Sequence, residues 1–145
     1  MNDKAVRVLL VEDNPADALL AAELIRETGV LADITTVSDG EIAISTLEKI
    51  MENQAETPNL ILLDINLPKK NGHEVLGFIE RMHLEDAFVA IYTGSSSPED
   101  ERNAREHGAD AYIIKPIGSK EMERTVERFR DILIPSRRHP EQMTN

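Results

Sequence analysis

Five side chains that could carry out chemistry follow directly after apolar runs in this sequence or lie at their ends. Three are carboxylates, one is a hydroxyl and one is an ammonium: Glu12, Asp13, Asp64, Thr93 and Lys115. Because ligands bind outside the carboxyl ends of the strands in an open α/β sheet, we expect all five at one edge of such a sheet. Each alone has an ordinary explanation as a cap, a strand end or a solvated charge, but together they favour a functional site.

The chemistry of this set is that of phosphoryl transfer. Crowded carboxylates repel one another unless a cation neutralises them, and an all-oxygen site with open positions suits Mg²⁺. Lys115 would add a fixed positive charge and Thr93 a hydroxyl donor, which phosphoryl transfer also requires. One carboxylate can itself be the nucleophile and form an aspartyl phosphate. Asp64 is the best candidate, because it stands alone after what we expect to be a central strand.

The elements that must position these residues alternate along the chain. Short runs rich in Val, Ile and Leu are typical of strands buried on both faces of a parallel sheet. We expect strands at 6–11, 34–37, 60–63, 88–92 and 111–114. Caps and breakers predict helices from Asn14-Pro15 to Gly29, from Asp39 to Met51, after Asn71-Gly72, from Ser97-Pro98 to Gly108, and from Ser119 to Pro135.

This alternation predicts a doubly wound α/β domain: a five-stranded parallel sheet of flavodoxin-like order 2-1-3-4-5, with helices on both faces. The stretch 53–59 predicts a polar loop. The fourth helix is unusual, since Ala104 is its only apolar side chain beyond Pro98. A helix that buries so little is weakly held, although a short solvated surface helix explains the pattern equally well.

Composition excludes several classes of protein. The 145 residues hold 16 Lys+Arg against 27 Asp+Glu, a net charge of −11, with no Cys and no Trp. This length indicates one domain, and the lack of Cys excludes disulfides, thiolate metal sites and thiol nucleophiles. The acidity and the few aromatics argue against nucleic acid as a partner. No apolar run approaches the roughly 20 residues that span a bilayer, so we expect a cytoplasmic protein without membrane contact.

Five separated motifs resemble those of the response-regulator receiver domain of bacterial two-component signalling. They are VLLVEDN (8–14), LILLDINLPKKNG (60–72), YTGSS (92–96), Gly-Ala-Asp (108–110) and AYIIKP (111–116). The resemblance extends from Val6 to Leu133. It implies a single receiver domain over residues 1–133, followed by a short tail at 134–145 and no output domain.

The resemblance assigns the phosphoacceptor and its metal. It implies that Asp64 accepts a phosphoryl group from a phosphohistidine of a sensor histidine kinase. It implies Mg²⁺ or Mn²⁺ held by Asp13, Asp64 and the main-chain carbonyl of Asn66, with Glu12 acting through a water. The chain would be a phosphoacceptor that promotes only its own phosphorylation and dephosphorylation, not an enzyme acting on other substrates.

The resemblance also assigns the conformational switch. Lys115 would pair with the phosphoryl oxygens, and its bond to Pro116 would be a cis peptide. Thr93 would move to meet the phosphoryl group, and the ring of Tyr112 would turn into the vacated space. The Asn66 side chain would tune the phosphoryl lifetime.

The implied partners are proteins. The switch would signal by protein contact or phosphorelay through the fourth helix, fifth strand and last helix, and these elements with the tail are the candidate surface for a homodimer. The phrases VEDNPAD, LDINLPKKNG and TGSSSPED resemble stand-alone regulators that partner phytochrome-type sensor histidine kinases. Many of those relatives carry Thr where this chain has Gly94.

Three alternatives remain beside this interpretation. A degenerate, phosphorylation-independent receiver is disfavoured by the presence of Asp64, Thr93 and Lys115. A Mg²⁺-dependent aspartyl phosphohydrolase would need a second acid two residues after the nucleophile, where this chain has Asn66. A flavin-binding protein would carry its phosphate loop after the first strand rather than the fourth. The four histidines show no metal-binding spacing, and we expect them on surfaces: His73, His83, His107 and His139.

Overall fold

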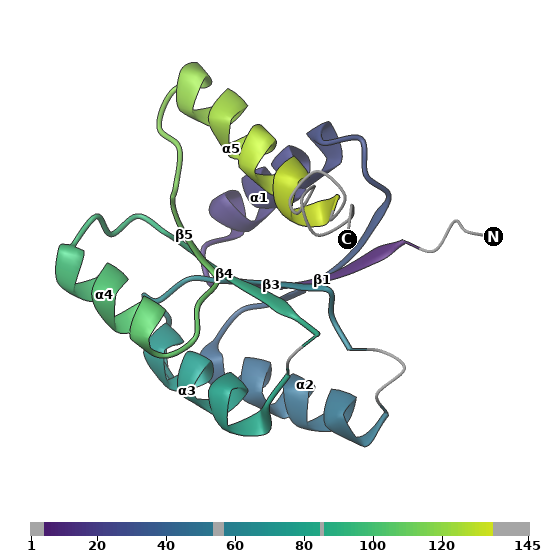
Figure 1. Cartoon of the computed structure of the whole chain (residues 1–145), viewed down its shortest axis with the longest axis vertical. Helices are drawn as coiled ribbons and strands as arrows, with labels where there is room; N and C mark the ends of the chain where they lie inside the picture. Colours follow the sequence, from purple (N-terminus) through teal and green to yellow (C-terminus); the bar gives the residue numbers. More distant parts are fainter. Residues whose placement is uncertain (1–4, 54–56, 85, 135–145) are drawn as a thin grey trace, which may run out of the picture.

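The computed structural model describes residues 5–53, 57–84 and 86–134. Within these ranges five strands alternate with five helices (Figure 1). In chain order the elements are β1 (Val6–Val11), α1 (Pro15–Glu27), β2 (Ala32–Val37), α2 (Gly40–Glu52), β3 (Leu60–Leu63), α3 (Gly72–Met82), β4 (Phe88–Thr93), α4 (Pro98–Glu106), β5 (Ala111–Ile114) and α5 (Ser119–Leu133). Apart from Ile134, the predicted tail lies outside the described residues, as do residues 54–56 of the predicted loop.

The sheet has the predicted topology. Its five strands are parallel and lie in the order β2-β1-β3-β4-β5, so β3 is central. The second strand begins at Ala32, two residues earlier than expected, because Ala32 and Asp33 pair with Val6 and Arg7 of β1. β2 is an edge strand on which Asp33 and Thr35 are exposed. Because these residues are polar, a search for apolar runs does not detect where the strand starts.

Two apolar cores lie on the two faces of the sheet. α1 and α5 cover one face, and α2, α3 and α4 cover the other (Figure 1). Successive strand residues alternate between the cores: Leu60 and Leu62 pack toward α1 and α5, whereas Ile61 and Leu63 pack on the opposite side. Burial on both faces explains why the central strands read as unbroken apolar runs.

Side-chain caps start four of the helices where the sequence predicted them. Each cap accepts a hydrogen bond from the backbone N–H three residues ahead: Asn14 from Asp17, Asp39 from Ile42, Asn71 from Glu74, and Ser97 from Asp100. The Glu74 side chain also accepts from the backbone of Asn71, which completes a capping box. α5 instead starts after Gly118, which provides no side-chain cap.

Gly72 permits a close approach between α3 and the main chain that follows the central strand. A Cβ at this position would overlap the main chain of Asp64 and Ile65, so a glycine is required. The Gly72 N–H donates to the Ile65 carbonyl at 3.1 Å. The first residue of α3 is therefore fixed against the peptide that follows the central strand.

No helix in the described ranges combines the length and apolarity that crossing a bilayer would need.

We predict that Gly72→Ala destabilises the protein by about 2 kcal/mol, because the added methyl group overpacks a backbone contact that cannot yield. Gly77→Ala, in the same helix, is the matched control, since the nearest atom to its Cβ would be the Arg81 guanidinium at 3.6 Å. The control should gain about 0.5–1 kcal/mol from helix propensity. Urea unfolding of the two variants measures both changes, and equal shifts would contradict the close contact at Gly72.

Candidate functional site

The predicted chemical side chains gather at the carboxyl edge of the sheet. Glu12 and Asp13 follow β1, Asp64 follows β3, Thr93 ends β4 and Lys115 follows β5. Carboxylate oxygens of Glu12, Asp13 and Asp64 lie within 4.8 Å of one another. Glu12 and Asp64 are buried, whereas Asp13 is exposed at the rim.

Backbone pairing continues past the strand ends and fixes these residues. The Asp64 N–H donates to the Val11 carbonyl at 3.1 Å, and the Glu12 N–H donates to the Val37 carbonyl at 3.0 Å. The Asp64 carboxylate then turns back and accepts from the Asn66 N–H at 3.0 Å. The Asp64 carboxylate is therefore held by the start of the loop that leads to α3.

A single ammonium joins the carboxylates. Lys115 Nζ donates to Asp64 Oδ2 at 2.9 Å and to Asp17 Oδ2 at 2.8 Å. It also lies 2.8 Å from Glu12 Oε1, an ion pair that lacks the geometry of a hydrogen bond. The Lys115 side chain is only 16% exposed, so solvent screens these contacts weakly.

Asp17 belongs to this group and was missed from the sequence. As an acid in the first turn of α1, Asp17 also interacts favourably with the helix dipole. One signal was available: α1 starts at the edge where the other carboxylates collect, so an acid in its first turn lies beside them. Its contact with Lys115 depends on the reach of a long side chain from β5, which spacing does not reveal.

The pKa shifts show which charges are favourable here. Burial alone would lower the pKa of Lys115, but the contacts with Asp17, Glu12 and Asp64 outweigh burial and hold it above its usual value. Burial raises the pKa of Glu12, and the nearby Asp64 charge adds to the rise, although Lys115 and the Asn14 N–H oppose it. The ammonium is stabilised in its charged form, whereas the Glu12 carboxylate is charged at a cost.

The Glu12 carboxylate has room for a further partner. Its Oε2 accepts from the Asn14 N–H at 3.1 Å, but its Oε1 has no hydrogen bond within the part of the chain that the structure describes. Its contact with Lys115 Nζ is an ion pair only, so this buried acceptor is incompletely satisfied. With Asp13 and Asp64 in reach, the donor set is all oxygen and suits a hard divalent cation.

Thr93 and Tyr112 meet at a shared neighbour rather than at the carboxylates. The Thr93 side chain is fully buried, and its Oγ1 accepts from the Ser95 N–H at 3.3 Å. The Tyr112 ring is also buried, and its hydroxyl donates to the Ser95 carbonyl at 3.0 Å. The Lys115 N–H donates to the Thr93 carbonyl at 2.7 Å, which joins the ends of β4 and β5.

The predicted cis peptide at Pro116 is wrong. No peptide bond in residues 5–53, 57–84 and 86–134 is cis, so the bond from Lys115 to Pro116 is trans. An X–Pro bond favours trans by roughly 0.5–1 kcal/mol. The trans bond is compatible with burial of Pro116 and with the main-chain bond from Lys115 to Thr93.

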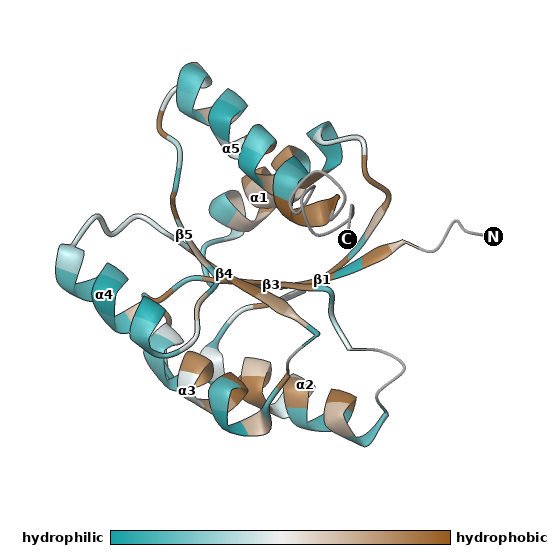
Figure 2. Cartoon of the chain, viewed as in Figure 1, coloured by the Kyte–Doolittle hydropathy of each residue, from teal (hydrophilic) through white to brown (hydrophobic). Residues whose placement is uncertain are grey.

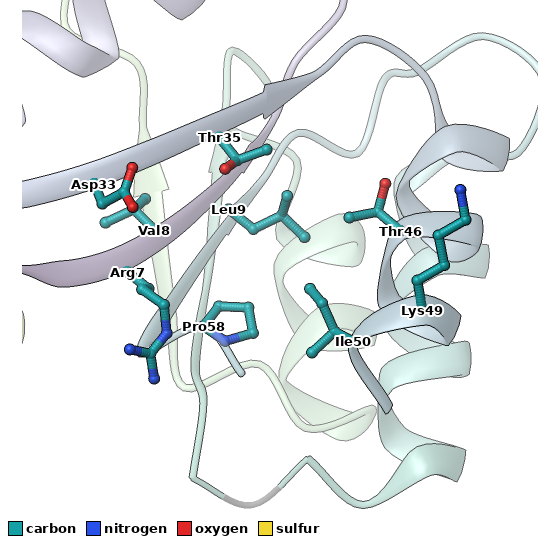
Figure 3. Close-up of a pocket in the computed structure, with 9 residues that line it drawn as sticks. All are labelled: Arg7, Val8, Leu9, Asp33, Thr35, Thr46, Lys49, Ile50 and Pro58. Atoms are coloured by element: carbon teal, nitrogen blue, oxygen red, sulfur yellow. The ribbon is translucent and has the colours of Figure 1, made fainter. Parts of the chain in front are cut away.

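Other polar features lie away from this edge. A cavity of about 450 Å³ between β2 and α2 (Figure 3) is lined by Arg7, Val8, Leu9, Asp33, Thr35, Thr46, Lys49, Ile50 and Pro58. Its lining comes from β1, β2, α2 and Pro58, and it includes none of the predicted site residues. Glu12, Asp13 and Asp64 form the only cluster of His, Cys, Asp or Glu among the described residues that could hold a metal ion. The predicted surface residue His139 lies outside the described residues.

Comparisons with known proteins agree with this arrangement. A family profile described as the response regulator receiver domain matches residues 8–127. The probable methanogenesis regulatory protein FilR2 of Methanothrix harundinacea is 35% identical over 134 residues, covering 92% of this chain and 86% of that protein. Response regulator Rcp1 of Synechocystis sp. is 34% identical over 122 residues, covering 83% of each.

Two solved structures are similar to this chain in both fold and sequence. The phosphorylated cyanobacterial phytochrome response regulator RcpA has a TM-score of 0.80 at 31% identity, covering 92% of this chain and 96% of that one. The Mn²⁺-bound form of Rcp1 has a TM-score of 0.74 at 32% identity, covering 86% and 91%.

We predict that Lys115→Gln lowers the free energy of unfolding by about 3 kcal/mol at neutral pH, because it leaves the buried Glu12 and Asp64 charges unpaired. The loss should shrink as the pH falls and Glu12, whose pKa is raised by burial, becomes protonated, since a neutral carboxyl no longer needs the ammonium. Lys120→Gln, on the exposed surface of α5, is the control and should change stability by about 0.5 kcal/mol or less. Denaturant unfolding across the acid range tests this, and a loss independent of pH would contradict the ion-pair interpretation.

Proposed function

Because this chain belongs to the response regulator receiver domain family, we propose that it accepts a phosphoryl group on Asp64 from a sensor histidine kinase. The observation that carries the proposal is the single ammonium of Lys115, 2.9 Å from Asp64 Oδ2, beside a group of three carboxylates. A carboxylate so placed is a nucleophile with a counter-charge at hand and oxygen ligands around it. This arrangement supports phosphoryl transfer better than solvation of a charged surface, because Glu12 and Asp64 are buried.

The transfer forms one bond and breaks another. An Asp64 carboxylate oxygen attacks the phosphorus of a phosphohistidine, a P–O bond forms, and the electron pair of the P–N bond returns to the imidazole of the kinase. Lys115 already donates to Asp64 Oδ2, so its ammonium lies where negative charge accumulates on the phosphoryl oxygens. Asp17 keeps that ammonium anchored while its bond to Asp64 is exchanged.

Asp13, Asp64 and the main-chain carbonyl of Asn66 would hold the metal, with Glu12 acting through a water. The clustered carboxylates support this set, as does Glu12 Oε1, which has the ion pair with Lys115 but no hydrogen bond among the described residues. Bound Mg²⁺ or Mn²⁺ supplies neutralisation of the carboxylates and of the incoming phosphoryl group. The exposed Asn66 side chain then tunes the lifetime of the aspartyl phosphate from the open side of the site.

The switch follows from the contacts of Thr93 and Tyr112. The Thr93 hydroxyl accepts a long bond of 3.3 Å from Ser95, which it gives up at little cost to donate to a phosphoryl oxygen. Tyr112 then follows into the vacated space. Contacts made only in this arrangement shift a pre-existing equilibrium, and α4, β5 and α5 present the result to a partner.

The partner is a phytochrome-type histidine kinase, and residues 1–133 act as one receiver unit with a tail at 134–145. Similarity to the phytochrome response regulator RcpA supports this pairing. The output is contact with another protein or phosphorelay. One such contact is a homodimer through α4, β5, α5 and the tail.

We predict that acetyl phosphate with Mg²⁺ adds one phosphoryl group to the protein and that Asp64→Asn abolishes the addition, because an amide oxygen does not form the acyl phosphate. Intact-protein mass spectrometry measures the stoichiometry. Asp33→Asn, on the exposed edge strand, is the control and should leave it unchanged. An equally phosphorylated Asp64→Asn protein would place the acceptor elsewhere.

We predict that Asp13→Asn weakens Mn²⁺ binding by roughly 10- to 100-fold, because it removes a charged oxygen ligand from the rim. Water-proton relaxation during a Mn²⁺ titration reports binding without any phosphoryl chemistry. The Asp33→Asn protein again serves for comparison, and it should bind Mn²⁺ like the parent. The metal site would lie elsewhere if Asp13→Asn bound Mn²⁺ with unchanged affinity.

A further inference from the structure

α4 has little apolar attachment to the rest of the protein. Ala104 is the only buried residue among its nine, whereas α3 buries five of eleven. Figure 2 shows α4 as almost wholly hydrophilic, in contrast to the brown strands beside it. Polar contacts must therefore decide where this helix lies.

Ser95 supplies the polar contact that joins α4 to the switch residues. Each of its polar groups has a partner: the N–H donates to Thr93 Oγ1 at 3.3 Å, the carbonyl accepts from the Tyr112 hydroxyl at 3.0 Å, and Oγ donates to Asp100 Oδ2 at 2.7 Å. Oγ also accepts from the Ser97 N–H at 3.2 Å, so its one proton is committed to Asp100. A displacement of Ser95 is thus felt by both Tyr112 and the first turn of α4.

Asp100 has a second partner on α3. Its Oδ1 lies 3.6 Å from His73 Nε2, and His73 Nδ1 lies 3.0 Å from the Asn103 amide nitrogen. Because that amide nitrogen is a donor, His73 accepts at Nδ1 and its neutral form carries the proton at Nε2, facing Asp100. His73 directly follows Gly72, which abuts the Asp64 peptide, so this second tether leads back to the phosphoacceptor.

The two attachments of Asp100 differ in strength. The Ser95 hydroxyl bond is short and charge-assisted, whereas the His73 contact at 3.6 Å is longer than a hydrogen bond. In the resting arrangement Asp100 is therefore tied mainly to the loop after β4. If Ser95 is drawn away, Asp100 remains beside His73, and the bond between Asn103 and His73 still joins α4 to α3.

We propose that Ser95 is a positioning residue that couples Thr93 and Tyr112 to α4 through its hydroxyl bond to Asp100. The Ser95–Asp100 tether of the unphosphorylated protein is inferred from the contacts alone, whereas its release on phosphorylation depends on the proposed function. When Thr93 turns toward a phosphoryl oxygen, it gives up the Ser95 N–H. The loop then moves with Tyr112, and the bond from Ser95 to Asp100 in the first turn of α4 is released.

The resting tether is tested by amide hydrogen exchange of the full chain without Mg²⁺ or phosphate. Ser95→Ala removes only the hydroxyl and keeps both main-chain bonds of this residue. We expect exchange across residues 98–106 to accelerate about tenfold, the scale of one hydrogen bond to a charged group, with residues 60–63 unchanged. Ser95→Thr restores a hydroxyl and should restore slow exchange.

Glu101→Ala is the matched control for this measurement. It removes a neighbouring carboxylate of α4 that pairs with Arg105 rather than with Ser95. This variant should accelerate exchange less than Ser95→Ala does. Equal exchange in Ser95→Ala and the parent protein, or equal acceleration in Glu101→Ala, would overturn the tether.

The coupling is tested by adding beryllium fluoride with Mg²⁺, a mimic of the phosphoryl group. The parent protein should change its exchange across residues 98–106, Ser95→Ala should lose most of that change, and Ser95→Thr should keep it. Phosphorylation by acetyl phosphate, followed by mass, should be equal in all three proteins. An undiminished change in Ser95→Ala would overturn the coupling. A parent protein that takes up no phosphoryl group would instead refute the proposed function, and the tether would then be tested only by the exchange measured without Mg²⁺ or phosphate.

Discussion

The ammonium of Lys115 is the contact on which the edge of the sheet depends. It lies within 2.9 Å of carboxylate oxygens from three separate segments: Glu12 after β1, Asp17 in α1 and Asp64 after β3. Burial of Glu12 and Asp64 without this cation would leave two unpaired charges, at a total cost of about 3 kcal/mol. The parallel register is what makes the contact available, because it brings the carboxyl ends of β1, β3 and β5 to one edge.

The same contact leaves the site short of positive charge. One ammonium faces the carboxylates of Glu12, Asp17 and Asp64, with Asp13 at the rim, and Glu12 Oε1 lacks a hydrogen bond within the described ranges. The raised pKa of Glu12 has the same origin, since burial and the Asp64 charge both disfavour its ionised form. A site of this kind gains stability from any cation or hydrogen-bond donor that enters it. Holding like charges together in this way lowers the intrinsic stability of the fold, as is common at functional sites.

Prediction from sequence succeeded where local physics decides the structure. Apolar runs predicted the central strands and polar caps predicted helix starts, whereas the solvated start of the edge strand β2 was missed. Asp64 and Lys115 were found because each comes directly after a strand. Asp17 and Ser95 were not, because their partners lie far along the chain: Lys115 reaches Asp17 across 98 positions, and Tyr112 reaches Ser95 across 17. No periodicity encodes such contacts.

The contrast between α4 and the other helices explains how a small change at this edge can be transmitted. Apolar burial is non-directional and tolerates small displacements, whereas a hydrogen bond weakens steeply once its length or angle departs from the optimum. α1, α2, α3 and α5 each bury three or more residues, but α4 buries Ala104 alone. A shift at Ser95 too small to disturb the packed helices would therefore be large enough to break its bond to Asp100. The helix with the poorest core contact is the one that the proposed change at Asp64 would move.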